Sequence, residues 1–155
     1  MAGRIDARLS ELGIELPEAA APVANYIPFV VSGGLVFVAG QVTLWKGEIQ
    51  YVGKLGAEFS VEEGYQAARI SGLNLLTQFR AACDGDLDRV KRLVRLGVFV
   101  NSIPDFTRQP EVANGASDLM VEVFGDAGRH ARTAVGVPAL PLGIAVEADA
   151  VFEIA

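Results

Sequence analysis

The stretch Ile144-Ala-Val-Glu-Ala-Asp-Ala-Val-Phe-Glu-Ile154 alternates in character from one residue to the next. Its even-numbered positions are all apolar, whereas Glu147, Asp149 and Glu153 stand at odd-numbered positions. Because successive side chains of a strand point to opposite faces of a sheet, this alternation predicts a strand with one buried face and one open face. It is the clearest two-residue period in the chain, and it indicates that the fold is built on a sheet.

Two amphipathic helices are predicted upstream of this strand. The sequence Ser60-Val-Glu-Glu63 is a capping box, so a helix is expected to begin at Val61, and its apolar stripe continues to the vicinity of Asp84-Gly85. Pro110 suits the first turn of a second helix, which Gly125 ends. The apolar stripe of each helix has to cover a sheet.

The remaining β-rich segments complete a two-layer arrangement. They are the hairpin 26–31 and 35–39 around Ser32-Gly33-Gly34, the run Val90 to Asn101, and the extended segment 129–137. The order ββ-α-β-α-ββ predicts an α+β two-layer sandwich, a mixed sheet with two helices on one face. Residues 1–155 are expected to form one domain, in which residues 1–24 are a short helix and a linker.

Composition narrows the classes of function. Hydrophobic residues make up 51% of the 155 residues, but no apolar run approaches the roughly 20 residues that a membrane span needs. The net charge of −6 disfavours nucleic acid and anionic membranes as partners. Charges near Met1 argue against a signal peptide, so a cytoplasmic location is expected, and the apolar excess favours an oligomer. One cysteine and one histidine leave no expectation of a metal centre or a cofactor.

Arg132 and Glu147 are the candidates for chemistry. Each is a charged residue among apolar or small neighbours in a predicted strand, where a charge needs a partner or a ligand. If the two strands pair around the loop 138–143, a structural salt bridge between them is an equally good interpretation. His130 shares a strand face with Arg132, and a histidine beside an arginine is one ingredient of phosphodiester cleavage. A solvated strand end is the preferred interpretation of His130, because no second histidine is available as the partner acid. Cys83, near a helix C-terminus, is not expected to act as a nucleophile.

Together these segments resemble the YjgF/Rid (reactive intermediate deaminase) family, whose members are also labelled L-PSP endoribonucleases. The resemblance covers roughly Tyr26 to Ile154. It rests on Val38-Ala-Gly-Gln41, on Val98-Phe-Val100 before Asp105-Phe106, and above all on Ala131-Arg-Thr-Ala-Val-Gly-Val-Pro-Ala-Leu-Pro141 followed by Val146-Glu-Ala-Asp149. The family implies a chorismate-mutase-like fold that assembles as a homotrimer, with active-site clefts between subunits.

The resemblance also implies roles for individual residues. The arginine that holds the substrate carboxylate falls on Arg132, the glutamate that positions water falls on Glu147, and the assisting backbone carbonyl falls on Ala134. Substrate-binding positions fall on Tyr26 and, after a one-residue adjustment, on Asn114. Ala39 stands where the family usually has serine, and this change, the N-terminal helix and a longer loop over 42–59 mark a divergent branch.

The expected function is hydrolysis of small 2-enamino or 2-imino acids to 2-oxo acids and ammonia. This reaction needs a fixed cation for the carboxylate, a positioned water and proton transfer, and it needs neither metal nor organic cofactor. The alternatives are an endoribonuclease of the L-PSP type and a trimeric, non-catalytic module that binds small carboxylates. The acidic charge and the lone histidine argue against the ribonuclease, and the binding module has no need of Glu147.

Overall fold

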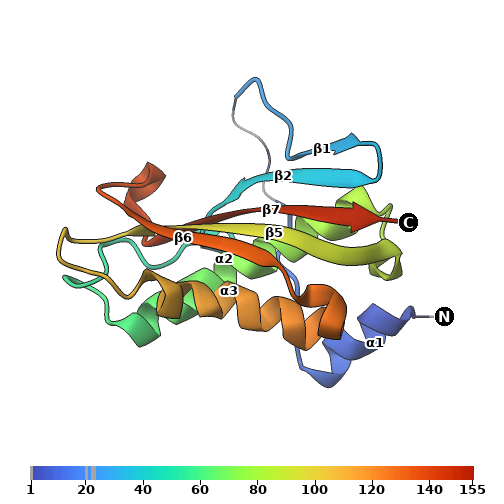
Figure 1. The fold of residues 1–155 in the computed structure, drawn as a ribbon, viewed down its shortest axis with the longest axis horizontal. Helices are drawn as coiled ribbons and strands as arrows, with labels where there is room; N and C mark the ends of the chain where they lie inside the picture. Colours follow the sequence, from blue (N-terminus) through green and yellow to red (C-terminus); the bar gives the residue numbers. More distant parts are fainter. Residues whose placement is uncertain (1, 20, 22–23) are drawn as a thin grey trace.

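A five-stranded sheet forms the centre of the protein in a computed structural model that describes residues 2–19, 21 and 24–155 (Figure 1). The strand order is β1-β2-β7-β5-β6, in which β5 and β6 are parallel and the other neighbours are antiparallel. The predicted α+β class and mixed sheet are confirmed. The strands are β1 (Phe29–Ser32), β2 (Leu35–Gln41), β5 (Val90–Asn101), β6 (Ala131–Val137) and β7 (Val146–Ile154).

The alternating stretch near the C-terminus is β7, which lies in the middle of the sheet. Its apolar residues, Val146 to Phe152 in steps of two, are buried against the helices. The ring of Phe152 lies 4.1 Å from that of Phe79, measured between centroids. The acidic residues of the stretch therefore fall on the opposite face, as the two-residue period predicts.

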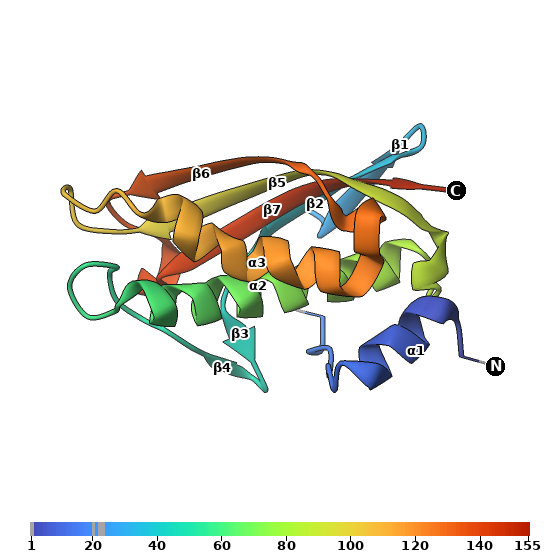
Figure 2. The same ribbon diagram turned by 60° about the horizontal axis from the view of Figure 1, so that its bottom comes forward.

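Helices α2 (Val61–Ala82) and α3 (Gln109–Phe124) cover the same face of the sheet (Figure 2). The predicted capping box is present, because Glu63 N–H donates to Ser60 Oγ and the Glu63 carboxylate accepts from Ser60 N–H. Pro110 lies in the first turn of α3, and Gly125, with φ of 63°, ends it. Local signals in the sequence thus determine where α2 begins and where α3 begins and ends.

The two helices touch at Gly115. A Cβ atom on this residue would overlap the carbonyl oxygen of Tyr65 on α2. Only glycine allows the two backbones to approach this closely, and the approach sets the position of α3 over the sheet.

We predict that Gly115→Ala destabilises the fold by about 1–3 kcal/mol, because the added methyl group forces the helices apart. The expected direction is opposite to the usual gain of about 0.5–1 kcal/mol for this change within a helix. Urea unfolding measures the effect. Gly34→Ala is the matched control, since its Cβ would meet nothing closer than 3.8 Å and the free energy of unfolding should stay within about 0.5 kcal/mol of wild type. Equal stability of both variants would contradict the prediction.

A third helix, α1 (Arg4–Glu11), lies at one end of the helical layer, where the sequence predicts a short helix. Ile5 and Leu9 are buried, and the Asp88 carboxylate accepts hydrogen bonds of 2.8 Å from the backbone N–H groups of Arg4 and Ile5. These bonds hold the pKa of Asp88 below its ordinary value. The smaller elements are the hairpin β3 (Leu44–Trp45) and β4 (Glu48–Ile49), within the long 42–59 loop, and the turns η1 (Leu87–Arg89), η2 (Gly125–Gly128) and η3 (Pro141–Gly143).

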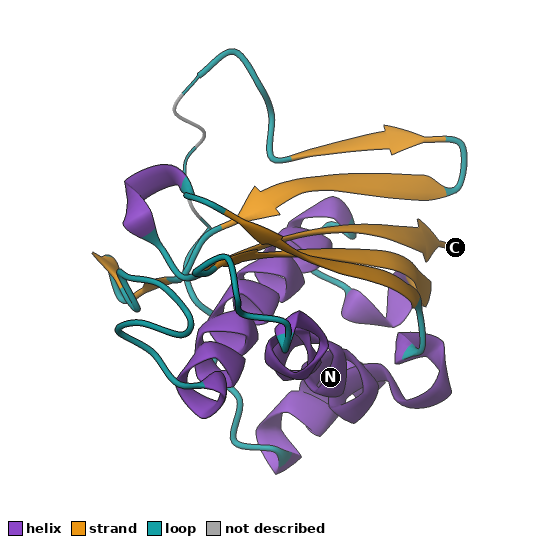
Figure 3. Ribbon diagram, turned by 60° about the vertical axis from the view of Figure 1, so that its left-hand side comes forward, coloured by secondary structure: helices purple, strands orange, loops and turns teal. Residues whose placement is uncertain are grey.

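The face of the sheet opposite the helices carries exposed apolar side chains. No α-helix in the described ranges covers it (Figure 3). Val30, Phe37 and Val135 are 50%, 47% and 40% exposed. The register assigns them to this open face, because the residues next to them on β2 and β6 point toward the helices. Exposed apolar surface of this kind is typical of a surface that a partner covers.

Candidate functional site

Arg132 lies on the edge strand β6, and its side chain points toward α3. The register places it beside Leu96, which is buried beneath the helices. Its Nη1 donates hydrogen bonds of 2.8 Å to Asn114 Oδ1 and 3.1 Å to Ser117 Oγ. Asn114 and Ser117 are three residues apart on α3, so both acceptors reach the same nitrogen. Two of the predicted site residues, Arg132 and Asn114, are therefore in direct contact.

The other edge of the Arg132 guanidinium is free to bind. Both hydrogens of Nη1 are directed at α3, whereas Nε and Nη2 make no hydrogen bond to any described residue. None of the ion pairs formed by the described residues includes Arg132. A half-buried cation without an anionic partner is costly, and the Nε–Nη2 edge matches the two oxygens of a carboxylate. This arrangement is suited to binding a small anion.

The carbonyl group of Ala134 points out of the sheet edge. Ser102 N–H donates to the carbonyl oxygen of Val137 at 3.2 Å, so Val137 turns its backbone groups toward β5. Backbone groups alternate sides along a strand, and Ala134 is three residues away, so its carbonyl faces away from β5. It can accept a hydrogen bond from water or a ligand close to Arg132.

Glu147 does not share a face of the sheet with Arg132. Strand β5 lies between β6 and β7, with Leu96 level with Arg132 and Phe99 level with Glu147. Leu96 and Phe99 are three residues apart, so their side chains and those of their partners point to opposite faces. The alternative prediction of a structural salt bridge between Arg132 and Glu147 required β6 to pair directly with β7, and it is wrong.

Glu147 is a half-buried carboxylate on the open face. Burial raises its pKa above the ordinary value, and the nearby charge of Asp149 raises it further. A Cβ on Gly40 would lie 2.5 Å from Glu147 Oε1, so the missing side chain at this position makes room for the carboxylate. A carboxylate of raised pKa in such a place is suited to taking up and returning a proton.

We predict that Asp149→Asn lowers the pKa of Glu147. The change removes a like charge and also frees Arg95, which pairs with Asp149 at 3.4 Å. Carboxyl ¹³C NMR of Glu147 over a pH titration measures the effect. Asp126→Asn, a change at a fully exposed carboxylate, serves as the control and should leave the titration unchanged. An unchanged pKa of Glu147 in Asp149→Asn would contradict this account.

Of the remaining predicted residues, Ala39 lies near Glu147, whereas Tyr26 lies in the loop before the edge strand β1. Ala39 directly precedes Gly40, and its carbonyl accepts a hydrogen bond of 2.9 Å from Gln41 Nε2. Tyr26 is 50% exposed just before β1, at the sheet edge opposite β6. One chain thus presents two half-sites: Arg132, Asn114 and Ala134 at one edge, and Glu147 with the neighbouring Ala39 on the open face. The structure does not bring Tyr26 together with either half-site.

Ser117 is a residue of the site that the sequence did not reveal. His130 Nε2 lies 2.9 Å from Ser117 Oγ, so His130 and Arg132 meet at this hydroxyl. The predicted common face of His130 and Arg132 is confirmed. A serine within an amphipathic helix gives no signal of its own, although its three-residue spacing from Asn114 placed it on the same helix face.

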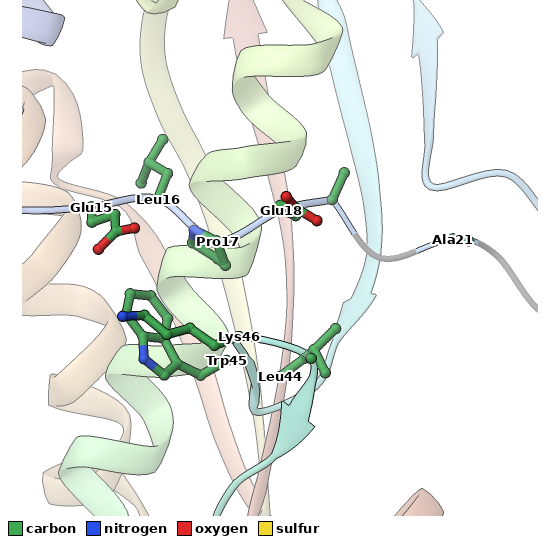
Figure 4. Close-up of a pocket in the computed structure, with 10 residues that line it drawn as sticks. Glu15, Leu16, Pro17, Glu18, Ala21, Leu44, Trp45 and Lys46 are labelled. Carbon is green, nitrogen blue, oxygen red and sulfur yellow. The ribbon is translucent and has the colours of Figure 1, made fainter.

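The other features lie away from these half-sites. A cavity of about 590 Å³ lies between residues 15–19 and 21 on one side and the β3–β4 hairpin on the other (Figure 4). It is lined by Trp45 and Lys46, and by none of the predicted site residues. Cys83 is buried at the end of α2, and burial raises the pKa of its thiol. Within residues 2–19, 21 and 24–155, no cluster of three or more histidine, cysteine or acidic side chains could hold a metal ion. No helix among them is long and apolar enough to cross a membrane.

Comparison with known proteins identifies the class of protein to which this fold belongs. Residues 6–149 match the family described as "YjgF/chorismate mutase-like, putative endoribonuclease". The chain therefore belongs to the YjgF/Rid family, as its signature segments suggest.

Particular relatives extend this assignment over nearly the whole chain. Protein TCP17 of Trypanosoma cruzi is 54% identical over 155 residues, which cover 98% of this chain and 95% of the relative. Protein Atu1372 of Agrobacterium tumefaciens is 44% identical, with a TM-score of 0.90 over 97% of this chain and 93% of that one. A putative endoribonuclease from Shewanella oneidensis MR-1 is 38% identical, with a TM-score of 0.94 over 98% and 100%.

Proposed function

We propose that the protein hydrolyses small 2-enamino or 2-imino acids to 2-oxo acids and ammonia. The observation that carries the proposal is the half-buried Arg132 guanidinium, which has an open Nε–Nη2 edge and no acidic partner among the described residues. A carboxylate fits that edge in a bidentate manner. The E. coli protein TdcF has been solved with bound serine, a small amino acid, on the same fold.

The reaction follows from the chemistry of the two half-sites. Arg132 holds the substrate carboxylate, which fixes C2 and its imine nitrogen. Glu147 takes a proton from a water molecule whose oxygen forms a bond to C2, and the Ala134 carbonyl orients that water. Glu147 then returns the proton to the imine nitrogen, which gives a carbinolamine. Transfer of the carbinolamine hydroxyl proton to nitrogen, again through Glu147, breaks the C–N bond, forms the C=O bond of the 2-oxo acid and releases ammonia. The raised pKa of Glu147 favours this repeated uptake and return of a proton.

The complete site requires two copies of the chain. Arg132 and Glu147 face opposite sides of one sheet and therefore cannot both touch one small substrate. The exposed apolar face and the unpaired edge of β6 offer surfaces for a neighbouring copy. We propose a homotrimer, as the family resemblance implies, in which the Arg132 half-site of one subunit meets the Glu147 half-site of the next.

We predict that Arg132→Ala loses carboxylate binding, whereas Glu147→Gln keeps carboxylate binding and loses turnover. Loss of the guanidinium should cost about 2–5 kcal/mol of carboxylate binding. Glu147→Gln keeps the shape but removes the base, so turnover should fall about 10²- to 10⁴-fold while carboxylate binding changes little. Calorimetry with a small carboxylate and an ammonia-release assay on freshly generated imino acids measure the two effects. Carboxylate binding without turnover in the wild-type protein would favour the binding module instead.

We further predict that the two inactive variants complement each other. In a mixed trimer, a Glu147→Gln subunit supplies an intact Arg132 and an Arg132→Ala subunit supplies an intact Glu147. Random mixing at equal amounts should restore about one quarter of wild-type turnover, since each half-site is intact in half of the subunits. Light scattering should report about three times 16.4 kDa. A monomer, or mixtures that stay inactive after verified subunit exchange, would overturn the shared site.

Endoribonuclease activity is the second candidate, favoured by the family description and by the name of the Shewanella oneidensis relative. His130 is the one histidine available for acid–base catalysis of phosphodiester cleavage. The net charge of −6 opposes binding of a polyanion. Specific cleavage of unstructured RNA by the purified protein, lost in His130→Gln, would place this candidate first.

A further inference from the structure

Four groups form a hydrogen-bonded chain that ends at Arg132, and the proposed reaction gives no role to the other three, which are Ser117, His130 and the Gly128 carbonyl. His130 Nδ1 lies 2.6 Å from the carbonyl oxygen of Gly128, and its Nε2 lies 2.9 Å from Ser117 Oγ. A carbonyl oxygen can only accept, so Nδ1 carries the proton in neutral His130 and Nε2 is an acceptor. Ser117 therefore donates to His130 and accepts from Arg132 Nη1 at 3.1 Å. Every donor in the chain points from Arg132 toward Gly128.

We propose that Ser117 and His130 are positioning residues for Arg132 and couple carboxylate binding to uptake of one proton by His130. Ser117 Oγ accepts a hydrogen bond from one hydrogen of Arg132 Nη1, and Asn114 Oδ1 accepts from the other. The guanidinium is thereby held in one orientation, in which its Nε–Nη2 edge is left free for a carboxylate. This inference rests on the proposed role of Arg132 as the carboxylate-binding group.

Among the described residues, no carboxylate forms a hydrogen bond or ion pair with His130. Burial, and then the nearby Arg132 cation, lower the pKa of His130 below its ordinary value, against the opposing hydrogen bond to Gly128. The charged groups on the neighbouring elements have other partners. On η2, Asp126 pairs with Arg129, and on α3, Asp118 bonds to Tyr65 and Glu122 pairs with Arg69. On β5, Arg92 donates to the Arg129 carbonyl and Arg95 pairs with Asp149. Arg132 is thus the charge to which His130 responds.

Protonation of His130 favours an anion at Arg132 in two ways. It adds a second positive charge near the guanidinium, which attracts the carboxylate. It also turns Nε2 into a donor, so Ser117 Oγ accepts from both His130 and Arg132 and its own O–H is released for another acceptor, such as the bound carboxylate. Because the charged form of His130 binds the anion more tightly, the bound anion must raise the pKa of His130 by linkage.

His130 is the one histidine in the sequence, so its ring signal in ¹H–¹³C NMR is unambiguous. The experiment titrates this signal with pH, with and without sodium pyruvate, a 2-oxo acid that stays ionised throughout the histidine range. We expect pyruvate to raise the pKa of His130. We also expect pyruvate affinity, measured by calorimetry, to be about three- to tenfold higher on the acid side of that pKa than on the alkaline side.

Three variants separate this coupling from a merely structural role. His130→Gln keeps an acceptor for Ser117 but cannot be protonated, so it should remove the part of the pH dependence that His130 causes. Ser117→Ala should weaken the pyruvate-induced shift in the pKa of His130, and Ser117→Thr should restore it. Pyruvate that binds without moving the pKa of His130 would overturn this inference and leave the carboxylate site standing. No binding of pyruvate at all would overturn both.

Discussion

The position of β5 between β6 and β7 is the constraint on which the rest of the arrangement depends. Parallel strands cannot be joined by a tight turn, so β5 and β6 need a crossover, and α3 supplies it. The crossover places α3 over β6, where Asn114 and Ser117 reach Arg132. The same insertion separates β6 from β7 and sets the three-residue offset that turns Glu147 to the other face. One topological choice thus builds the surroundings of Arg132 and turns Glu147 to the opposite face of the sheet.

Two glycines turn this topology into precise geometry. Gly115 lets α3 approach the backbone of α2, which fixes where the two acceptors for Arg132 Nη1 stand. Gly40 leaves space beside Glu147, whose carboxylate would otherwise collide with a side chain on β2. Neither residue has a left-handed φ, so the need is for close approach and not for an unusual backbone conformation. The shape of both half-sites therefore depends on glycine, which has no side chain, at these two positions.

The elements of the fold could be predicted from the sequence because their signals are local. The alternation over residues 144–154, the capping box at Ser60 and the Pro110–Gly125 pair each lie within one element. Strand order is a long-range property, and the short loop after β6 wrongly suggested that β6 and β7 could pair. The family signature singled out Arg132 and Glu147, but not the faces to which they point. Ser117 could not be predicted, because its role depends on a contact with His130, which lies 13 residues later in the sequence and outside α3.

The balance of charge shows why a small carboxylate suits this site better than a polyanion. The chain carries an excess of six negative charges, yet Arg132 has no acidic partner among the described residues. At physiological ionic strength the field of distant charges fades over about 8 Å, so a ligand of a few atoms at Arg132 responds mainly to that guanidinium and to His130. An RNA strand extends over many such lengths and meets the acidic surface as well. For the function that we propose, local attraction inside a repulsive mean field therefore favours small anions over a polyanion, and a positive charge on the nearby His130 would add to that attraction.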